Sequence, residues 1–168
     1  IQDIMDFLKS KQAYRQRGIP YQRGYLFQGP PGNGKTSFVK AVAGEVGLSI
    51  YLMDLGDKKL SDLDLQWLFA SIPSKSLLLL EDIDQAEVNR KPAEPAKKGE
   101  EGSPESKESG ITLSGLMNAL DGILSGETGR IVVMTTNRPE SLPEALVRPG
   151  RIDKKVDFPN ANASGAVQ

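Results

Sequence analysis

The sequence predicts an α/β fold, built as a doubly wound, mainly parallel five-stranded sheet flanked by helices. Short apolar runs alternate along the chain with segments of helical periodicity, which is typical of strand–helix–strand units with right-handed crossovers. Residues 77–80 are four consecutive leucines, and a continuous apolar run is typical of a strand buried on both faces of a parallel sheet.

The elements follow one another in a regular order. The predicted strands cover residues 24–28, 49–53, 77–80, 130–135 and 152–158. The predicted helices cover residues 1–14, 35–45, 61–72, 112–124 and 143–147. Every helix after the first lies between two strands, as a sheet with helical crossovers requires.

Local signals set several of these boundaries. In the first helix, Ile4, Phe7 and Leu8 recur at helical spacing among polar neighbours. Ser61 is a predicted N-cap, because its hydroxyl can accept a hydrogen bond from a free amide of the first turn. Gly47 is a predicted stop signal, because glycine readily adopts the left-handed conformation that ends many helices.

One domain accounts for the 168 residues. We expect residues 1–158 to form it, with residues 159–168 as a tail that stops before any further subdomain. Residues 89–110 hold three prolines, many Lys, Glu and Ser, and two apolar side chains, so we expect a disordered insertion. A solvated, variable loop is the favoured interpretation, and a partner-binding arm is the alternative.

Composition excludes several classes of function. The chain has no Cys and no His, which excludes disulfides, thiol nucleophiles, Ser-His triads and zinc sites built from Cys and His. The net charge of −1 argues against a generally basic face, so no nucleic-acid partner is expected. The chain starts at Ile1 rather than Met, so we interpret it as a fragment and expect membrane attachment only through segments outside it.

A phosphate-binding loop is the strongest motif. Residues 29–36 match G-x-x-x-x-G-K-[ST] between a predicted strand and a predicted helix. Their backbone amides can converge on phosphate oxygens, Lys35 can reach the β- and γ-phosphates, and Thr36 can ligate Mg²⁺. The predicted cofactors are therefore ATP and Mg²⁺. The predicted nucleotide-binding residues here are Gly29, Pro30, Pro31, Gly32, Asn33, Gly34, Lys35, Thr36 and Ser37.

Further polar residues follow later strands. Glu81 and Asp82 end the leucine strand, at the edge where open α/β sheets bind ligands; one carboxylate can hold Mg²⁺ while the other polarises the attacking water. Asn137 follows the next strand and can hold this water or touch the γ-phosphate. Arg148 and Arg151 flank a Pro-Gly turn and can stabilise charge on a phosphate. Solvated strand ends and surface turns are the alternatives.

These elements in this order resemble the AAA family of P-loop ATPases over residues 18–158. The resemblance implies the large α/β subdomain, with a small helical lid expected after Phe158 but missing from the sequence. It implies that Glu81 is the carboxylate on the Mg²⁺ side, where it holds the water shell of the cation. It also implies that Asp82 polarises the attacking water and that Asn137 is the sensor-1 residue. It further implies that Arg148 and Arg151 enter a neighbouring subunit's site in a homo-oligomeric ring. Adenine is expected to dock near the approach to the phosphate loop, at Gly18 and Ile19.

Residues 32–38, 43–45 and 113–122 resemble more closely the mitochondrial ATPases that assemble the cytochrome-bc complex (complex III). So does the order Glu81-Asp82, since most AAA proteins have Asp first. The loop at residues 54–60 has no aromatic residue to grip an unfolded chain. The resemblance implies a folded protein client of the Rieske iron-sulfur type and a place at the mitochondrial inner membrane, facing the matrix.

Two other classes of function remain open on the sequence. The first is a nucleotide-gated interaction module that binds ATP as a switch and hydrolyses little of it. The second is a P-loop kinase, which needs an acceptor pocket and usually an arginine-rich lid. The arrangement from Asn137 to Arg151 favours a ring ATPase over a kinase.

Overall fold

The computed structural model describes residues 1–55, 59–84, 110–124 and 128–160. Five strands in this part of the chain form one sheet, parallel throughout, in the order β2-β3-β4-β1-β5. The strands are β1 (Gln22–Gln28), β2 (Ser49–Asp54), β3 (Ser76–Glu81), β4 (Arg130–Thr136) and β5 (Lys154–Asp157). The predicted five-stranded parallel sheet is confirmed.

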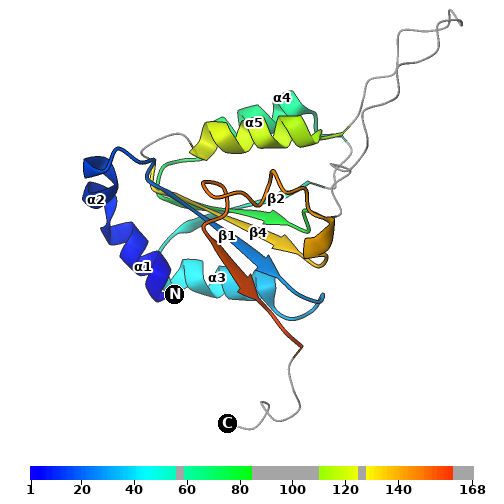
Figure 1. The fold of residues 1–168 in the computed structure, drawn as a ribbon, viewed down its shortest axis with the longest axis horizontal. Coiled ribbons are helices and arrows are strands. Elements are labelled where there is room, and N and C mark those ends of the chain that lie inside the picture. Colours follow the sequence, from blue (N-terminus) through cyan, green and yellow to red (C-terminus); the bar gives the residue numbers. More distant parts are fainter. Residues whose placement is uncertain (56–58, 85–109, 125–127, 161–168) are drawn as a thin grey trace, which may run out of the picture.

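Helices cover both faces of this sheet, which confirms the doubly wound arrangement. Figure 1 shows α4 and α5 together over one face, and α1 and α3 on the opposite side. The helices are α1 (Gln2–Lys9), α2 (Lys11–Gln16), α3 (Lys35–Val46), α4 (Asp62–Ser71) and α5 (Leu113–Leu124), with a short 3₁₀ helix, η2, at Pro139–Ser141. No helix in the described ranges is long and apolar enough to cross a membrane.

The leucines of β3 join the two hydrophobic cores. Leu78 and Leu80 pack in the cluster that α4 and α5 complete, whereas Leu77 and Leu79 pack in the cluster that α1 and α3 complete. All four are at most 1% exposed. Because successive side chains of a strand point to opposite faces, an unbroken apolar run is what a central strand between two helical layers requires.

Two predicted helix boundaries are confirmed. Ser61 caps α4 in a capping box, in which the Asp64 amide donates to the Ser61 hydroxyl and the Asp64 carboxylate accepts from the Ser61 amide. Gly47 ends α3 in the left-handed conformation, with φ at 69°. These caps fix where the two helices meet the loops beside the sheet.

Two helix predictions are wrong. The helix predicted over residues 1–14 is two helices, α1 and α2, separated at Ser10, whose hydroxyl donates to the Phe7 carbonyl at 2.7 Å and competes with regular helical bonding. Residues 143–147 form a turn rather than a helix. The amides of Leu146 and Val147 donate to carbonyl oxygens only three residues earlier, at 2.9 and 3.1 Å. Five residues are too few to offset the cost of starting an α-helix.

The predicted insertion at residues 89–110 falls outside the described residues except for Gly110. Of the predicted tail, residues 159 and 160 are described. Both expectations stay predictions.

Gly24 lets the loop before β5 cross β1 closely. A Cβ atom at this position would lie 1.7 Å from the carbonyl oxygen of Arg151. We therefore expect Gly24→Ala to destabilise the fold by about 3 kcal/mol or more. Gly44→Ala is the control, since this exposed site in α3 has no atom within 4 Å of a new Cβ; it should stabilise by about 0.5–1 kcal/mol. Chemical denaturation measures both, and an unchanged Gly24→Ala free energy of unfolding would contradict the close approach.

Candidate active site

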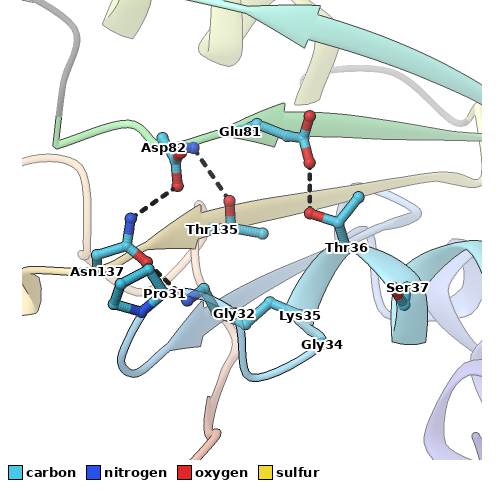
Figure 2. Close-up of a pocket in the computed structure, with 10 residues that line it drawn as sticks. All are labelled: Pro31, Gly32, Gly34, Lys35, Thr36, Ser37, Glu81, Asp82, Thr135 and Asn137. Carbon is cyan, nitrogen blue, oxygen red and sulfur yellow. Dashed lines mark hydrogen bonds between the residues drawn. The ribbon is translucent and has the colours of Figure 1, made fainter.

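A cavity of about 300 Å³ opens at the edge of the sheet where β1, β3 and β4 end. Figure 2 shows the residues that line it: Pro31, Gly32, Gly34, Lys35, Thr36, Ser37, Glu81, Asp82, Thr135 and Asn137. Because all strands are parallel, the three carboxyl ends meet at one edge and bring residues about a hundred positions apart into one site.

The loop between β1 and α3 forms one wall of this cavity. Gly34, the N-cap residue directly before α3, has a left-handed conformation with φ at 80°, which strongly favours glycine. No side chain in the described part of the chain caps this helix. The first-turn amides of α3 therefore remain free of side-chain partners next to a cavity, an arrangement that suits an anion such as a phosphate group.

Lys35 is buried, with only 7% of its surface exposed. Its ammonium donates to the carbonyl oxygens of Gly29 at 2.7 Å and Pro30 at 3.0 Å, and to Asn137 Oδ1 at 2.7 Å. All three acceptors are neutral, so among the described residues no carboxylate balances this charge. A phosphate oxygen would supply the missing negative partner.

Thr36 and Glu81 face each other across the cavity. The Thr36 hydroxyl donates to Glu81 Oε1, as Figure 2 shows. A hydroxyl and a single carboxylate are hard oxygen ligands of the kind Mg²⁺ uses when phosphates and water complete its coordination. No group of three or more acidic residues suited to a metal occurs in the described ranges. The donor set therefore fits a cation that arrives with a nucleotide.

Asn137 connects Lys35 to Asp82. Its Oδ1 accepts from the ammonium, and its Nδ2 donates to Asp82 Oδ1 at 3.0 Å. This amide orientation is determined by its partners, because an ammonium can only donate and a carboxylate can only accept. The side chains implied for phosphate contact and for water activation thus belong to one network.

Two further residues of this network were not among the predicted site residues. Asp84 accepts from the Thr136 hydroxyl at 2.8 Å and from the Asn137 amide at 3.1 Å, so it holds the end of β4. Thr135 lines the cavity and accepts from the Asp82 amide at 3.0 Å. The adjacency of Asp84 to Glu81-Asp82, and of Thr135 to Asn137, was the only sequence signal for either residue.

The predicted arginine pair lies near the amino-terminal ends of the strands, whereas the cavity lies at their carboxyl ends. Gln22, at the start of β1, donates to the Gly150 carbonyl at 3.0 Å, whereas the phosphate loop follows the end of β1. The strand has seven residues, which at about 3.3 Å per step separates the two edges by roughly 20 Å. The structure therefore does not bring Arg148 or Arg151 to the cavity of their own chain.

The two arginines also differ from each other. Arg151 forms a two-pronged ion pair with Asp121 of α5, at 2.8 and 2.7 Å, and this pair raises the pKa of its guanidinium. The Arg148 side chain is exposed, and it has no hydrogen bond or ion pair with any residue that the structure describes.

Five predicted nucleotide contacts do not line the cavity. Gly29 and Pro30 contribute only carbonyl oxygens that accept from Lys35. Gly18 and Ile19 come just before β1 begins, at the edge opposite the phosphate loop. Asn33 turns away from the cavity and donates to the Phe158 carbonyl at 3.0 Å. The structure thus brings the lysine, hydroxyl, acids and amide of the predicted site together, without these five residues.

Comparison with known proteins gives consistent matches. Residues 25–160 match the model of the "ATPase family associated with various cellular activities (AAA)". A "Probable mitochondrial chaperone bcs1" of Schizosaccharomyces pombe is 48% identical over 95% of the chain and 33% of that protein. A "Mitochondrial chaperone BCS1" of Danio rerio is 50% identical over 92% and 36%, and an AAA-ATPase of Arabidopsis thaliana is 37% identical over 98% and 32%. The chain thus spans about a third of the length of these relatives.

Proposed function

Since this chain belongs to the AAA family of ATPases, we propose that its cavity binds Mg·ATP and hydrolyses the bond to the γ-phosphate. The observation that carries the proposal is the network around Lys35, a buried ammonium whose hydrogen-bond acceptors are all neutral. It lies beside the first-turn amides of α3, which no described side chain caps. Incoming phosphates would replace the carbonyl oxygens of the loop as its partners. They would also accept from the amides of the first turn.

Each residue of the cavity has a separate role in the in-line attack of water on the γ-phosphate. Thr36 and Glu81 would hold Mg²⁺, which when bound neutralises charge on the phosphates. Asp82 accepts a proton from the attacking water as the water oxygen bonds to the γ-phosphorus and the bond to the β-phosphate oxygen breaks. Asn137 orients this water and links Asp82 to Lys35.

We further propose that the site is completed by Arg148 of another copy in a ring-shaped homo-oligomer. Arg148 supports this assignment because it is exposed and stands about one strand length from the cavity of its own chain. Arg151, the other predicted member of the pair, would have to leave Asp121 before it could reach a phosphate.

The client of such a ring is proposed from the relatives. We propose chaperone or translocase work on a protein client, and the relatives named as mitochondrial chaperones support the chaperone role. We propose assembly of complex III at the matrix side of the mitochondrial inner membrane, with a folded Rieske-type iron-sulfur protein as the client. The absence of an aromatic residue at positions 54–60 supports a folded client over a threaded chain.

Lys35→Ala tests the binding site. We expect this substitution to weaken ATP binding at least about tenfold, because a buried cation on the phosphates is lost. Calorimetric titration with Mg·ATP measures it. Lys40→Ala, at an exposed position of the same helix, is the matched control and should bind as the unchanged protein does. Equal affinity of the two variants would contradict the proposed site.

A further inference from the structure

The geometry points to Thr135 as a positioning residue: we propose that it aims Asp82 at the reacting water and acts on the reaction through Asp82 alone. The inference rests on the proposed function, in which Asp82 accepts the proton. It goes beyond that function because no motif implied a role for this threonine.

The backbone of Asp82 is unusual. Its φ angle is 45°, in the left-handed region that few residues other than glycine adopt, although aspartate tolerates it better than most. The chain leaves the sheet at this point, since Leu80↔Met134 is the last pair of the ladder between β3 and β4. Asp82 therefore needs contacts outside the ladder to hold this conformation.

Thr135 supplies two such contacts. Its Oγ1 accepts from the Asp82 amide at 3.0 Å, and its carbonyl accepts from the Ile83 amide at 3.0 Å. Figure 2 shows the first of these beside the bond from Asn137 to Asp82. Thr135 is 1% exposed, so water competes little for these acceptors. One residue of β4 thereby fixes two consecutive amides of the turn.

The turn has a direct consequence for the two acids. Successive side chains of a regular strand point to opposite faces, so Glu81 and Asp82 would face apart if β3 continued straight. In the structure both line one cavity, where Glu81 accepts from Thr36 and Asp82 accepts from Asn137 at 3.0 Å. By holding the left-handed turn, Thr135 allows adjacent residues to serve the cation and the water together.

Thr135→Val is the central variant, because valine has nearly the same shape but no hydroxyl to accept the Asp82 amide. We expect ATP turnover to fall about tenfold or more while the affinity for Mg·ATP changes less than about twofold. Thr135→Ser, which keeps the hydroxyl, should restore most of the turnover. Should the valine variant fail to fold, Thr135→Ala takes its place in the same comparisons.

Ser76→Ala is the matched control. Ser76 is 2% exposed at the start of β3, and its hydroxyl donates to the Pro73 carbonyl at 2.7 Å. The Ser76→Ala variant loses a buried hydroxyl at the end of β3 that lies away from the cavity. Its free energy of unfolding should therefore fall, while its turnover per folded protein should stay unchanged. Equal losses of turnover in this control and in Thr135→Val would overturn the proposal.

A double variant separates positioning from a general structural role. In an Asp82→Asn background, Thr135→Val should lower the residual turnover no further, because the residue through which it acts is already changed. A full additional loss, or a loss of nucleotide affinity in Thr135→Val as large as its loss of turnover, would overturn the proposal.

Amide hydrogen exchange distinguishes this inference from the proposed function. If the unchanged protein binds Mg·ATP but releases no phosphate as an assembled oligomer, the proposed function fails. Exchange at the Asp82 amide still tests Thr135 in that case: about tenfold faster exchange in Thr135→Val than in Thr135→Ser supports the positioning role. Equal exchange rates in the two variants overturn it.

Discussion

Arg148→Ala is expected to lower ATP turnover by about 10³-fold or more, which is the range over which arginines that stabilise the transferred phosphoryl group act. Binding of Mg·ATP should be little changed, because the arginine of the neighbouring copy is proposed to act on charge that develops in the transition state, while Lys35 and the phosphate loop are unchanged. The expected effect is therefore on the rate after binding. Steady-state phosphate release, together with calorimetric titration, measures the two quantities separately.

Arg17→Ala is the control for this variant. Arg17 is another exposed arginine outside the cavity, and its loss should leave both turnover and affinity as they are. If Arg148→Ala turned over ATP at the unchanged rate, the arginine that completes the site would have to come from elsewhere.

Asp82→Asn is the second large effect. General-base catalysis by a positioned carboxylate contributes about 10²- to 10⁴-fold, so turnover should fall by about that factor. The fold should be retained, because asparagine also tolerates the left-handed backbone at this position. ATP should still bind, since Lys35 and the loop are unchanged, and the variant should accumulate in its ATP-bound form. Filter binding of labelled nucleotide and single-turnover assays measure both outcomes.

Comparison with Glu81→Gln tests which acid has which role. Glu81 contacts Thr36 while Asp82 contacts Asn137, so Glu81→Gln should weaken the Mg²⁺ dependence of ATP binding, and Asp82→Asn should leave it unchanged. Asp6→Asn, on α1 and away from the cavity, controls for loss of one carboxylate. Reversed effects of the first two variants would contradict the assignment made from the order Glu-Asp.

Sequence reasoning predicted the features that depend on local signals. The leucine run of β3 predicted a central buried strand, and the capping residue Ser61 predicted the start of α4. The glycine-rich loop between strand and helix predicted one wall of the cavity, and its lysine, hydroxyl, acids and amide do meet there. These predictions were possible because parallel strands bring their carboxyl ends to one edge whatever the loops between them contain.

The features that could not be predicted depend on long-range contacts. Arg151 pairs with Asp121 thirty residues earlier, and Asp82 is held by Thr135 fifty-three residues later. A motif gives the order of such residues along the chain. It does not show which of their side chains form ion pairs or hydrogen bonds with distant residues of the same fold. The helix predicted over residues 143–147 was wrong because so short a segment cannot offset the cost of starting an α-helix, and its amide hydrogen bonds are those of a turn.

Mixing two inactive variants tests the central claim most directly. Lys35→Ala retains Arg148 but lacks the ammonium proposed to bind the phosphates, and Arg148→Ala has the reverse defect. If the active site is shared between copies, subunits of the two variants assembled together should regain turnover well above that of either variant alone. If mixed assemblies form and turnover remains at the sum of the separate variants, the account of a site completed by a second subunit is contradicted.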